Sequence, residues 1–257
     1  LRNFTMCRIA IFLKNLKYRK TYVDKFLLQS YTEKNTPGIN NDRDFNYHKD
    51  GYGFLFLKNK EWSLYKSSLM YKDDINNKFI QNNIMDSDIL IGHIRATKHH
   101  FIDDICYDNT HPFWYKEHFW MHNGSAQPLN YIFFKSYINA KYLVHIKGNT
   151  DSELLLYIFL SILDSVQDLI ESWNKFLELL NEFYEYHNIV ISANLVYCDN
   201  RKIIISRFIN NHEEPPSLYI DYQSLIISSE PVTDNYKLVG RNTSMIVDIS
   251  SKKIEII

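Results

Sequence analysis

The sequence predicts a single α+β domain with antiparallel sheets. Segments of strand character come first, two helical segments follow, and further strand-like segments end the sequence, without regular alternation of strands and helices. The chain has 257 residues, of which 45% are hydrophobic and 23% are charged. These values are typical of a soluble globular protein with a sizeable packed core, and they disfavour disorder and coiled coil.

The first half of the chain contains short apolar runs separated by polar stretches. Residues 7–13 (CRIAIFL) form a run without polar interruption except Arg8, which is typical of a buried strand. Two runs rich in aromatic residues flank Asn59 and Lys60, as in a β-hairpin. Residues 29–50 are polar and are expected to form a loop. Strands are predicted over residues 7–13, 52–58, 61–66, 89–95 and 118–122.

Two helices are predicted after residue 150. Thr150 and Glu153 have the spacing of a capping box, in which Thr150 accepts from a first-turn amide and Glu153 reaches back to the N–H of Thr150. This helix is expected to continue to about residue 164. Residues 166–187 carry apolar side chains at helical spacing and predict a second, longer helix. Strands are then predicted over residues 189–197, 202–208, 217–222, 225–228, 244–249 and 253–257.

Charge and cysteine content exclude several classes of protein. With 29 basic and 30 acidic residues the formal charge is -1, so no overall field attracts nucleic acid or anionic lipid. The longest apolar run, residues 154–163, is well short of the roughly 20 residues that span a bilayer, so no membrane segment is expected. The first residues have one basic residue and no long apolar stretch, so no signal peptide is expected. Cys7, Cys106 and Cys198 are unevenly spaced, which predicts a reducing, cytoplasmic location.

Four positions carry side chains whose chemistry allows more than a structural role. A cysteine that opens a strand, such as Cys7, is usually a small apolar residue, but at a chain start its own α-amine, with an ordinary pKa of about 8, could serve as its base. Arg95 is either a surface side chain or a clamp for a carboxylate. Asn123 and Gly124 form either a tight turn or a pair of donors to an oxyanion. Asp151 suits a helix start and could also bind an ammonium group.

The histidines are unevenly distributed. Six of the ten lie between His93 and His122. No H-E-x-x-H spacing or paired His/Cys spacing occurs, and His99 and His100 are adjacent, which rarely places both on one metal ion. We therefore expect no metal site, and a metal-dependent nuclease is the least favoured function.

Seven short motifs, taken together and in this order, resemble the glutaminase domain of class II glutamine amidotransferases. In particular they resemble the small stand-alone branch that includes the amidotransferase subunit of glutathione degradation and related γ-glutamyl hydrolases. The motifs are Met6-Cys7-Arg8, Asp50-Gly51-Tyr52-Gly53-Phe54, Gly92-His93-Ile94-Arg95-Ala96, Asn109-Thr110-His111-Pro112-Phe113, Met121-His122-Asn123-Gly124, Thr150-Asp151-Ser152-Glu153 and Ser229-Glu230-Pro231-Val232-Thr233.

The resemblance implies a fold and a chain organisation. The fold would be the four-layer αββα sandwich of N-terminal-nucleophile (Ntn) hydrolases, with two antiparallel sheets. Residues 7–257 would form a single glutamine amidotransferase type-2 domain. Residues 1–6 would be a leader or a mis-assigned start that is removed before Cys7, because the nitrogen of Cys7 cannot act as a base while it is part of an amide.

The resemblance also implies roles for particular residues. Cys7 would be the nucleophile and its own α-amine the base. Asn123 and the N–H of Gly124 would form the oxyanion hole. Arg95 would bind the α-carboxylate of the glutaminyl substrate and Asp151 its α-ammonium group.

Two further positions match the substrate pocket, Thr97 at its rim and His111 among the residues that shape it. In many relatives a threonine lies three residues after the arginine, whereas Thr97 lies two residues after Arg95. No cofactor and no metal is implied.

The implied reaction is hydrolysis of the γ-glutamyl amide of glutamine, or of another γ-glutamyl compound, through a thioester on Cys7. The protein would be either a free-standing hydrolase or an amidotransferase subunit that works with a separate partner protein. The alternative is a catalytically inactive amidotransferase fold that serves as a binding or regulatory subunit.

Overall fold

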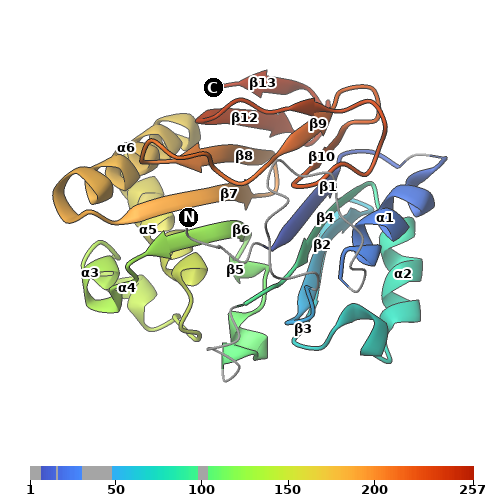
Figure 1. The fold of residues 1–257 in the computed structure, drawn as a ribbon, viewed down its shortest axis with the longest axis horizontal. Helices are drawn as coiled ribbons and strands as arrows, with labels where there is room; N and C mark the ends of the chain where they lie inside the picture. The colour runs from blue at the N-terminus through green and yellow to red at the C-terminus, as the bar shows by residue number, and fades with distance from the viewer. Residues whose placement is uncertain (1–6, 16, 31–47, 98–103) are drawn as a thin grey trace.

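The computed structural model describes residues 7–15, 17–30, 48–97 and 104–257, which form two antiparallel sheets between two layers of helices (Figure 1). Within the described residues, the first sheet has the order β11-β9-β10-β1-β4-β2-β3 and the second β13-β12-β8-β7-β6-β5. The strands of the first sheet are β1 (Arg8–Phe12), β2 (Tyr52–Lys58), β3 (Glu61–Ser67), β4 (Ile89–Ile94), β9 (Tyr219–Asp221), β10 (Ile226–Ser228) and β11 (Lys237–Leu238). Those of the second are β5 (Phe113–Tyr115), β6 (His118–Gln127), β7 (Val190–Cys198), β8 (Lys202–Ile209), β12 (Thr243–Asp248) and β13 (Ile254–Ile256).

The helices cover the outer faces of the two sheets (Figure 1). Those beside the first sheet are α1 (Arg19–Leu28) and α2 (Asn77–Met85), and the long pair on the second sheet is α5 (Asp151–Val166) and α6 (Leu169–His187). Two short helices, α3 (Tyr131–Lys135) and α4 (Ala140–Leu143), lie beside α5. The α+β prediction and the four-layer arrangement implied by the resemblance are therefore confirmed.

Strand β1 is buried on both faces. Ile9 and Ile11 belong to the apolar cluster between the two sheets, whereas Ala10 and Phe12 belong to the cluster under α1 and α2. Since no face of the strand meets water, the apolar run in the sequence does not alternate with polar residues. The residue that precedes this strand is Cys7, so the core of the molecule fixes its position.

Most of the predicted elements are present. The hairpin of β2 and β3 turns at Asn59 and Lys60, which have φ of 55° and 68°. The two long helices and the strands after residue 189 are also confirmed. The N-cap of α6 is Asp168, whose carboxylate accepts from the N–H of Glu171 at 2.8 Å. Residues 31–47 of the predicted loop lie outside the described residues.

The sequence analysis did not predict α1 and α2, which cover the first sheet. In α1 the buried face begins with Arg19 and continues with Val23 and Phe26, so a charged residue interrupts the apolar pattern. The side chain of Arg19 donates to the carbonyl and the hydroxyl of Ser87. In α2 the segment is rich in Asn, which is typical of loops. Burial against the sheet outweighs these weak local preferences.

Two observations concern the prediction of a reducing compartment without a membrane segment. All three cysteines are described and none of them forms a disulfide. Among the helices of the described ranges, none is both long enough and apolar enough to cross a membrane.

Candidate active site

Cys7 lies directly before β1, which β4 and β10 flank in the middle of the first sheet. Its side chain is partly buried, and its Sγ lies 3.5 Å from the backbone nitrogen of Ala96 and 3.6 Å from the carbonyl oxygen of Ala96. Because Arg8 pairs with Ile94, the cysteine stands where β4 ends. The thiol is therefore fixed at the end of a central strand.

The surroundings of the thiol act on its pKa in both directions. Burial raises the pKa of Cys7, whereas the N–H of Ala96 and the positive charge of Arg95 lower it, and the net change is upward. The thiol is therefore largely protonated at neutral pH. A base has to remove this proton before the sulfur becomes a nucleophile, and no described histidine is hydrogen-bonded to Sγ.

Arg95 follows β4 and is held through both its backbone and its side chain. Its N–H donates to the carbonyl of Gly51 at 2.8 Å, and its carbonyl accepts from the N–H of Asp50 at 3.2 Å. Its Nη1 donates to the carbonyl oxygens of Asp50 at 3.4 Å and Asp104 at 3.2 Å. The side chain is buried, and within the described residues it has no carboxylate partner. A guanidinium has five N–H donors, so this one retains donors for a carboxylate ligand.

The segment before β2 braces the chain around Arg95. Asp50 accepts through Oδ2 from the N–H of Thr97 at 2.7 Å. Gly51 has φ of 119°, and a Cβ there would lie 2.9 Å from a carbonyl oxygen of β3 and 3.0 Å from Oγ1 of Thr110, so glycine is required. Thr97 therefore supports the position of Arg95 through its backbone.

Asn123 and Gly124 lie in the middle of β6 and not in a turn. β6 pairs with β7 along its length, which places Gly124 opposite Ala193. A Cβ at Gly124 would lie 2.0 Å from a carbonyl oxygen of β7 and 2.5 Å from Cα of Ala193. Glycine is thus required for the close approach of two strands. The strand extends beyond the predicted residues 118–122 because pairing outweighs the low strand propensity of Asn and Gly.

The backbone N–H of Gly124 points away from β7. Residues two apart in a strand direct their N–H and C=O groups to the same side. The N–H of Ala126 donates to Oδ2 of Asp151 at 2.7 Å, and the carbonyl of His122 lies 3.2 Å from Nε2 of His93, so this side is opposite β7. β5 pairs only with the first residues of β6. The N–H of Gly124 therefore lies on an edge that no described strand covers.

The side chain of Asn123 lies between the two sheets. Met121 belongs to the same apolar cluster as Ile9 and Ile11 of β1, and side chains two residues apart share a face of a strand. Asn123 is 1% exposed, and its Oδ1 is buried without a hydrogen-bond partner among the described residues. Its Nδ2 donates to no described residue, so it is available as a donor. Buried amides are usually bonded, so a free one indicates a place where a ligand supplies the partner.

Asp151 is the first residue of α5 and joins this helix to β6. Its Oδ2 accepts from the N–H of Ala126 at 2.7 Å, and its Oδ1 accepts from the N–H of Ser152 at 2.8 Å. Its side chain remains 17% exposed. Its negative charge acts on Cys7 and raises the pKa of the thiol. The carboxylate thus holds β6 beside the helix, and its exposed part can bind a cation near the thiol.

Residues 36–213 match the model of the family described as glutamine amidotransferases class-II, which is more than half of the chain. The chain belongs to this family. The resemblance derived from the seven motifs is therefore confirmed. Cys7 precedes the matched range, whereas the other predicted site residues lie within it.

A curated relative of this class II amidotransferase is the probable glutamine amidotransferase DUG3 of Saccharomyces cerevisiae. The two are 26% identical over an alignment of 187 residues that covers 63% of this chain and 50% of the yeast protein. The chain thus spans about half the length of the curated relative it matches.

Two solved structures are similar to this class II amidotransferase. The glutamine aminotransferase class-II domain protein from Silicibacter pomeroyi is 16% identical, with a TM-score of 0.63 over 98% of both chains. The glutamine phosphoribosylpyrophosphate amidotransferase from B. subtilis, complexed with ADP and GMP, is 13% identical, with a TM-score of 0.62 over 98% of this chain and 48% of the other. At these identities the likeness shows a shared fold.

Three buried histidines of this class II amidotransferase lie behind the candidate site. The rings of His93 and His111 stack with centroids 3.9 Å apart, and Nδ1 of His122 lies 2.9 Å from Oγ of Ser152. Burial lowers the pKa of all three, that of His93 to about 3, so they are neutral at pH 7. Neither ring nitrogen of His111 has a partner within the described residues. Ring contacts with His93 and Phe113 therefore hold His111 in place.

The histidine-rich region shows no metal cluster where it is described. In that part of the chain, no group of three or more His, Cys, Asp and Glu side chains could hold a metal ion. His99 and His100 lie outside the described residues.

The predicted capping box is half correct. Oγ1 of Thr150 accepts from the N–H of Glu153 at 3.2 Å, as expected. Glu153, however, accepts from the N–H groups of Lys147 and Gly148 at 3.0 Å and 2.7 Å, and not from that of Thr150. The loop before α5 folds back and brings these two amides closer to the carboxylate. Glu153 thus orders the loop that leads to Asp151.

Two asparagines that the sequence analysis did not single out connect Arg95 to α5. Nδ2 of Asn109 donates to the carbonyl of Asp104 at 2.9 Å, and the N–H of Asn149 donates to Oδ1 of Asn109 at 2.9 Å. Since the carbonyl of Asp104 also accepts from Arg95, this contact ties the guanidinium to the start of the helix. Asn109 belongs to one of the seven motifs, but no sequence signal indicates that its partner is Asn149.

The late motif that begins at Ser229 lies beside the strand that follows Cys7. The N–H of Ile9 donates to Oγ of Ser229 at 3.0 Å, and Glu230 forms an ion pair with Arg8 at 3.7 Å. The motif therefore supports the position of Cys7.

The structure brings most of the predicted site residues to one place. The charges of Arg95 and of Asp151 both act on the thiol of Cys7. Asn123 and Gly124 lie on β6, which contacts β1. The remaining two lie at the margin, Thr97 after Arg95 and His111 behind His93.

Proposed function

We propose that this protein hydrolyses the γ-glutamyl amide of glutamine, or of a related γ-glutamyl compound, through a thioester on Cys7. The observation that carries the proposal is the setting of the thiol. It lies at the end of a central strand, beside a buried arginine that has no carboxylate partner among the described residues, and it faces the sheet that carries Asn123, whose side-chain amide has no hydrogen-bond partner within those residues.

The charges around the thiol suit the head group of an amino acid. Arg95 binds the α-carboxylate with the guanidinium donors that the two carbonyl oxygens leave free. Asp151 binds the α-ammonium group with the exposed part of its carboxylate. Both act at a fixed position, because backbone hydrogen bonds hold each residue to its strand or helix.

The reaction begins when the thiol of Cys7 transfers its proton to the α-amine of the same residue and the sulfur attacks the side-chain carbonyl of the substrate. The amide of Asn123 and the N–H of Gly124 donate to the oxyanion that forms. The α-ammonium then returns the proton to the departing nitrogen, and the amine leaves as the thioester forms. Water hydrolyses the thioester and restores the thiol.

The raised pKa of the Cys7 thiol supports the need for a dedicated base. An α-amine is such a base only if Cys7 is the first residue. We therefore include in the proposal that residues 1–6, which lie outside the described residues, are removed from the active protein.

The test combines the mature N-terminus with ammonia release from glutamine. Intact mass is expected to show a chain that begins at Cys7, and Cys7→Ala is expected to abolish ammonia release. Cys106→Ala is the matched control, since Cys106 is an exposed free cysteine, and it should keep the wild-type rate. Ammonia release by a chain that retains residues 1–6 would contradict the amine base, and release by Cys7→Ala would contradict the nucleophile.

Hydroxylamine tests the thioester separately because it intercepts acyl groups. The wild-type protein should form γ-glutamyl hydroxamate from glutamine, and Cys7→Ala should form none. A wild-type protein that starts at Cys7 and binds glutamine but releases no ammonia would instead support the inactive binding subunit. Ammonia release that rises severalfold with an added partner protein would favour the amidotransferase subunit over the free-standing hydrolase.

A further inference from the structure

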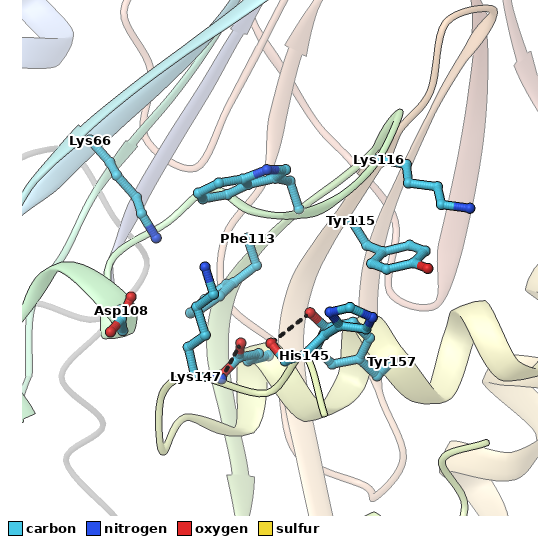
Figure 2. A pocket seen from close by; sticks show the side chains of 10 residues that line it. Lys66, Asp108, Phe113, Tyr115, Lys116, His145, Lys147 and Tyr157 are labelled. Atoms are coloured by element: carbon cyan, nitrogen blue, oxygen red, sulfur yellow. Dashed lines mark hydrogen bonds between the residues drawn. The ribbon is translucent and has the colours of Figure 1, made fainter. Parts of the chain in front are cut away.

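A polar cleft opens between the end of β3, β5 and the first turn of α5 (Figure 2). Its wall includes Lys66 from β3, Trp114 and Tyr115 from β5, Lys147 from the loop before α5, and Glu153 from α5. We call it the lysine cleft. It contains none of the residues assigned to the amide hydrolysis, and the sequence analysis predicted no site there.

Lys66 is a buried cation with few oxygen partners. It is 6% exposed, and its Nζ donates to the carbonyl of Thr110 at 2.8 Å. The same ammonium lies 4.5 Å, 5.1 Å and 5.3 Å from the ring centroids of Tyr107, Trp114 and Phe113. Ring faces attract a cation but accept no strong hydrogen bond. Two of its three N–H groups therefore have no oxygen acceptor among the described residues.

Lys147 brings a second cation to the same place. Its Nζ lies 5.9 Å from the ring centroid of Trp114, the ring that Lys66 also approaches. Figure 2 shows the two side chains reaching from opposite walls toward the same space. Like charges at close range repel, and burial together with Lys147 lowers the pKa of Lys66 to about 8.

The neighbouring carboxylates do not neutralise these cations directly. Within the described residues, neither Lys66 nor Lys147 has a carboxylate within 4.0 Å. Both oxygens of Glu153 accept from backbone N–H groups of the loop before α5. Asp108 lies at the side of the cleft (Figure 2) and acts on Lys66 only through its charge. Buried lysines without a paired anion are rare, so the space between the two ammonium groups favours an anionic ligand.

We propose that the lysine cleft binds a small organic oxyanion, a carboxylate or a phosphate ester, between the ammonium groups of Lys66 and Lys147. The ligand's apolar part lies against Tyr115 and against Trp114, which is 39% exposed. The site is separate from the proposed amide hydrolysis and does not depend on it.

The binding test uses the full processed protein and two probes, inorganic phosphate and malonate, titrated at constant ionic strength with chloride as the reference anion. Tryptophan fluorescence and the thermal midpoint report binding. The probe that binds more tightly shows whether the site prefers a phosphate or a carboxylate. Saturable binding of either probe, with a rise in thermal midpoint over chloride, is the expected result.

Substitutions locate the bound anion. Lys147→Gln and Lys66→Met should each weaken binding about tenfold or more, because a charge-assisted hydrogen bond is lost. Lys116→Gln is the matched control: it removes the same charge from the cleft rim, but its side chain points away from the other two lysines (Figure 2). Lys147→Gln also guards against misfolding of Lys66→Met, since Lys147 is exposed.

The pH dependence separates a bound anion from a general surface effect. Malonate keeps its charge from pH 7 to pH 9, so its affinity should fall as Lys66 loses its proton near pH 8. The other charged groups that act on Lys66 are Lys147, Asp108, Glu153 and the thiol of Cys106. The proposal is overturned if neither probe saturates, or if Lys147→Gln and Lys116→Gln bind as tightly as the wild type.

Discussion

The candidate active site and the lysine cleft share the segment of residues 104–114 and the start of α5, but different kinds of interaction hold their residues in place. In the candidate active site, strand register and backbone hydrogen bonds hold Cys7, Arg95 and Gly124. In the lysine cleft, side chains from β3, β5 and a loop meet through their rings and charges. A site fixed by backbone tolerates little change, whereas a site made of side chains can change without disturbing the fold. Four substitutions test this contrast.

The largest effect is expected for Asn123→Ala. Loss of one oxyanion donor should lower kcat for ammonia release by about 10²–10³. The unfolding free energy should change by less than about 1 kcal/mol, because the amide has no partner to lose among the described residues. Asn194→Ala is the contrasting control: its Nδ2 donates to the carbonyl of Ser217 at 2.8 Å, so stability should fall by about 1–3 kcal/mol. Full activity in Asn123→Ala would contradict the proposed role of Asn123 in the oxyanion hole.

Gly124→Ala tests the close approach of β6 and β7. The added Cβ would meet β7 backbone at 2.0 Å and 2.5 Å, so the strands must separate, at a cost of about 3 kcal/mol in unfolding free energy. Urea unfolding measures this change. Gly240→Ala is the matched control, since its Cβ would meet only the side chain of Thr243. Equal stability of the two variants would show that β6 can shift and that the strand is not a rigid support.

Acid should destabilise the protein through the buried histidines. Their pKa values are lowered in the folded state, so below pH 6.5 the unfolded chain binds more protons, and the stability present above that pH is lost as the pH falls. For His93, with a pKa of about 3, the loss at pH 5 is about 2 kcal/mol. His111→Phe removes one such group without breaking a hydrogen bond, so its unfolding free energy should fall less between pH 7.5 and pH 5. If the unfolding free energy of His111→Phe fell with pH as steeply as that of the wild type, the prediction would be contradicted.

The smallest effect is expected for Trp114→Ala in the lysine cleft. The side chain is 39% exposed, and its loss removes two cation–π contacts, so the unfolding free energy should fall by about 1 kcal/mol. Ammonia release should stay at the wild-type rate. Trp120→Ala, a fully buried tryptophan of the second sheet, should cost about 3–5 kcal/mol. A cost for Trp114→Ala as large as that for Trp120→Ala would mean that the cleft is a structural support.

The contrast also explains which residues could be predicted from the sequence. Cys7, Arg95 and Asn123 lie in motifs whose order along the chain could be recognised, and strands carry them to one place. The reading of Asn123 and Gly124 as a turn was one of two open alternatives, and only the pairing of β6 with β7 decides against it.

Other features could not be predicted because they depend on contacts between distant segments. The capping-box pattern predicted that Glu153 accepts from the N–H of Thr150. In the structure it accepts from the N–H groups of Lys147 and Gly148, because the preceding loop folds back. Helix α1 was not predicted because its buried face includes a charged residue, Arg19, whose hydrogen-bond partner Ser87 lies far away in the sequence. Lys66 and Lys147 are 81 positions apart in the numbering, and no local pattern relates them.

The hydrogen bond from the N–H of Ala126 to Asp151 has a consequence for how such an enzyme can change. The carboxylate proposed to select the substrate's ammonium group is also the anchor of the strand whose Gly124 N–H is proposed to stabilise the reaction. A substitution that moved Asp151 to fit a different head group would displace β6 as well. Selectivity and turnover would therefore change together.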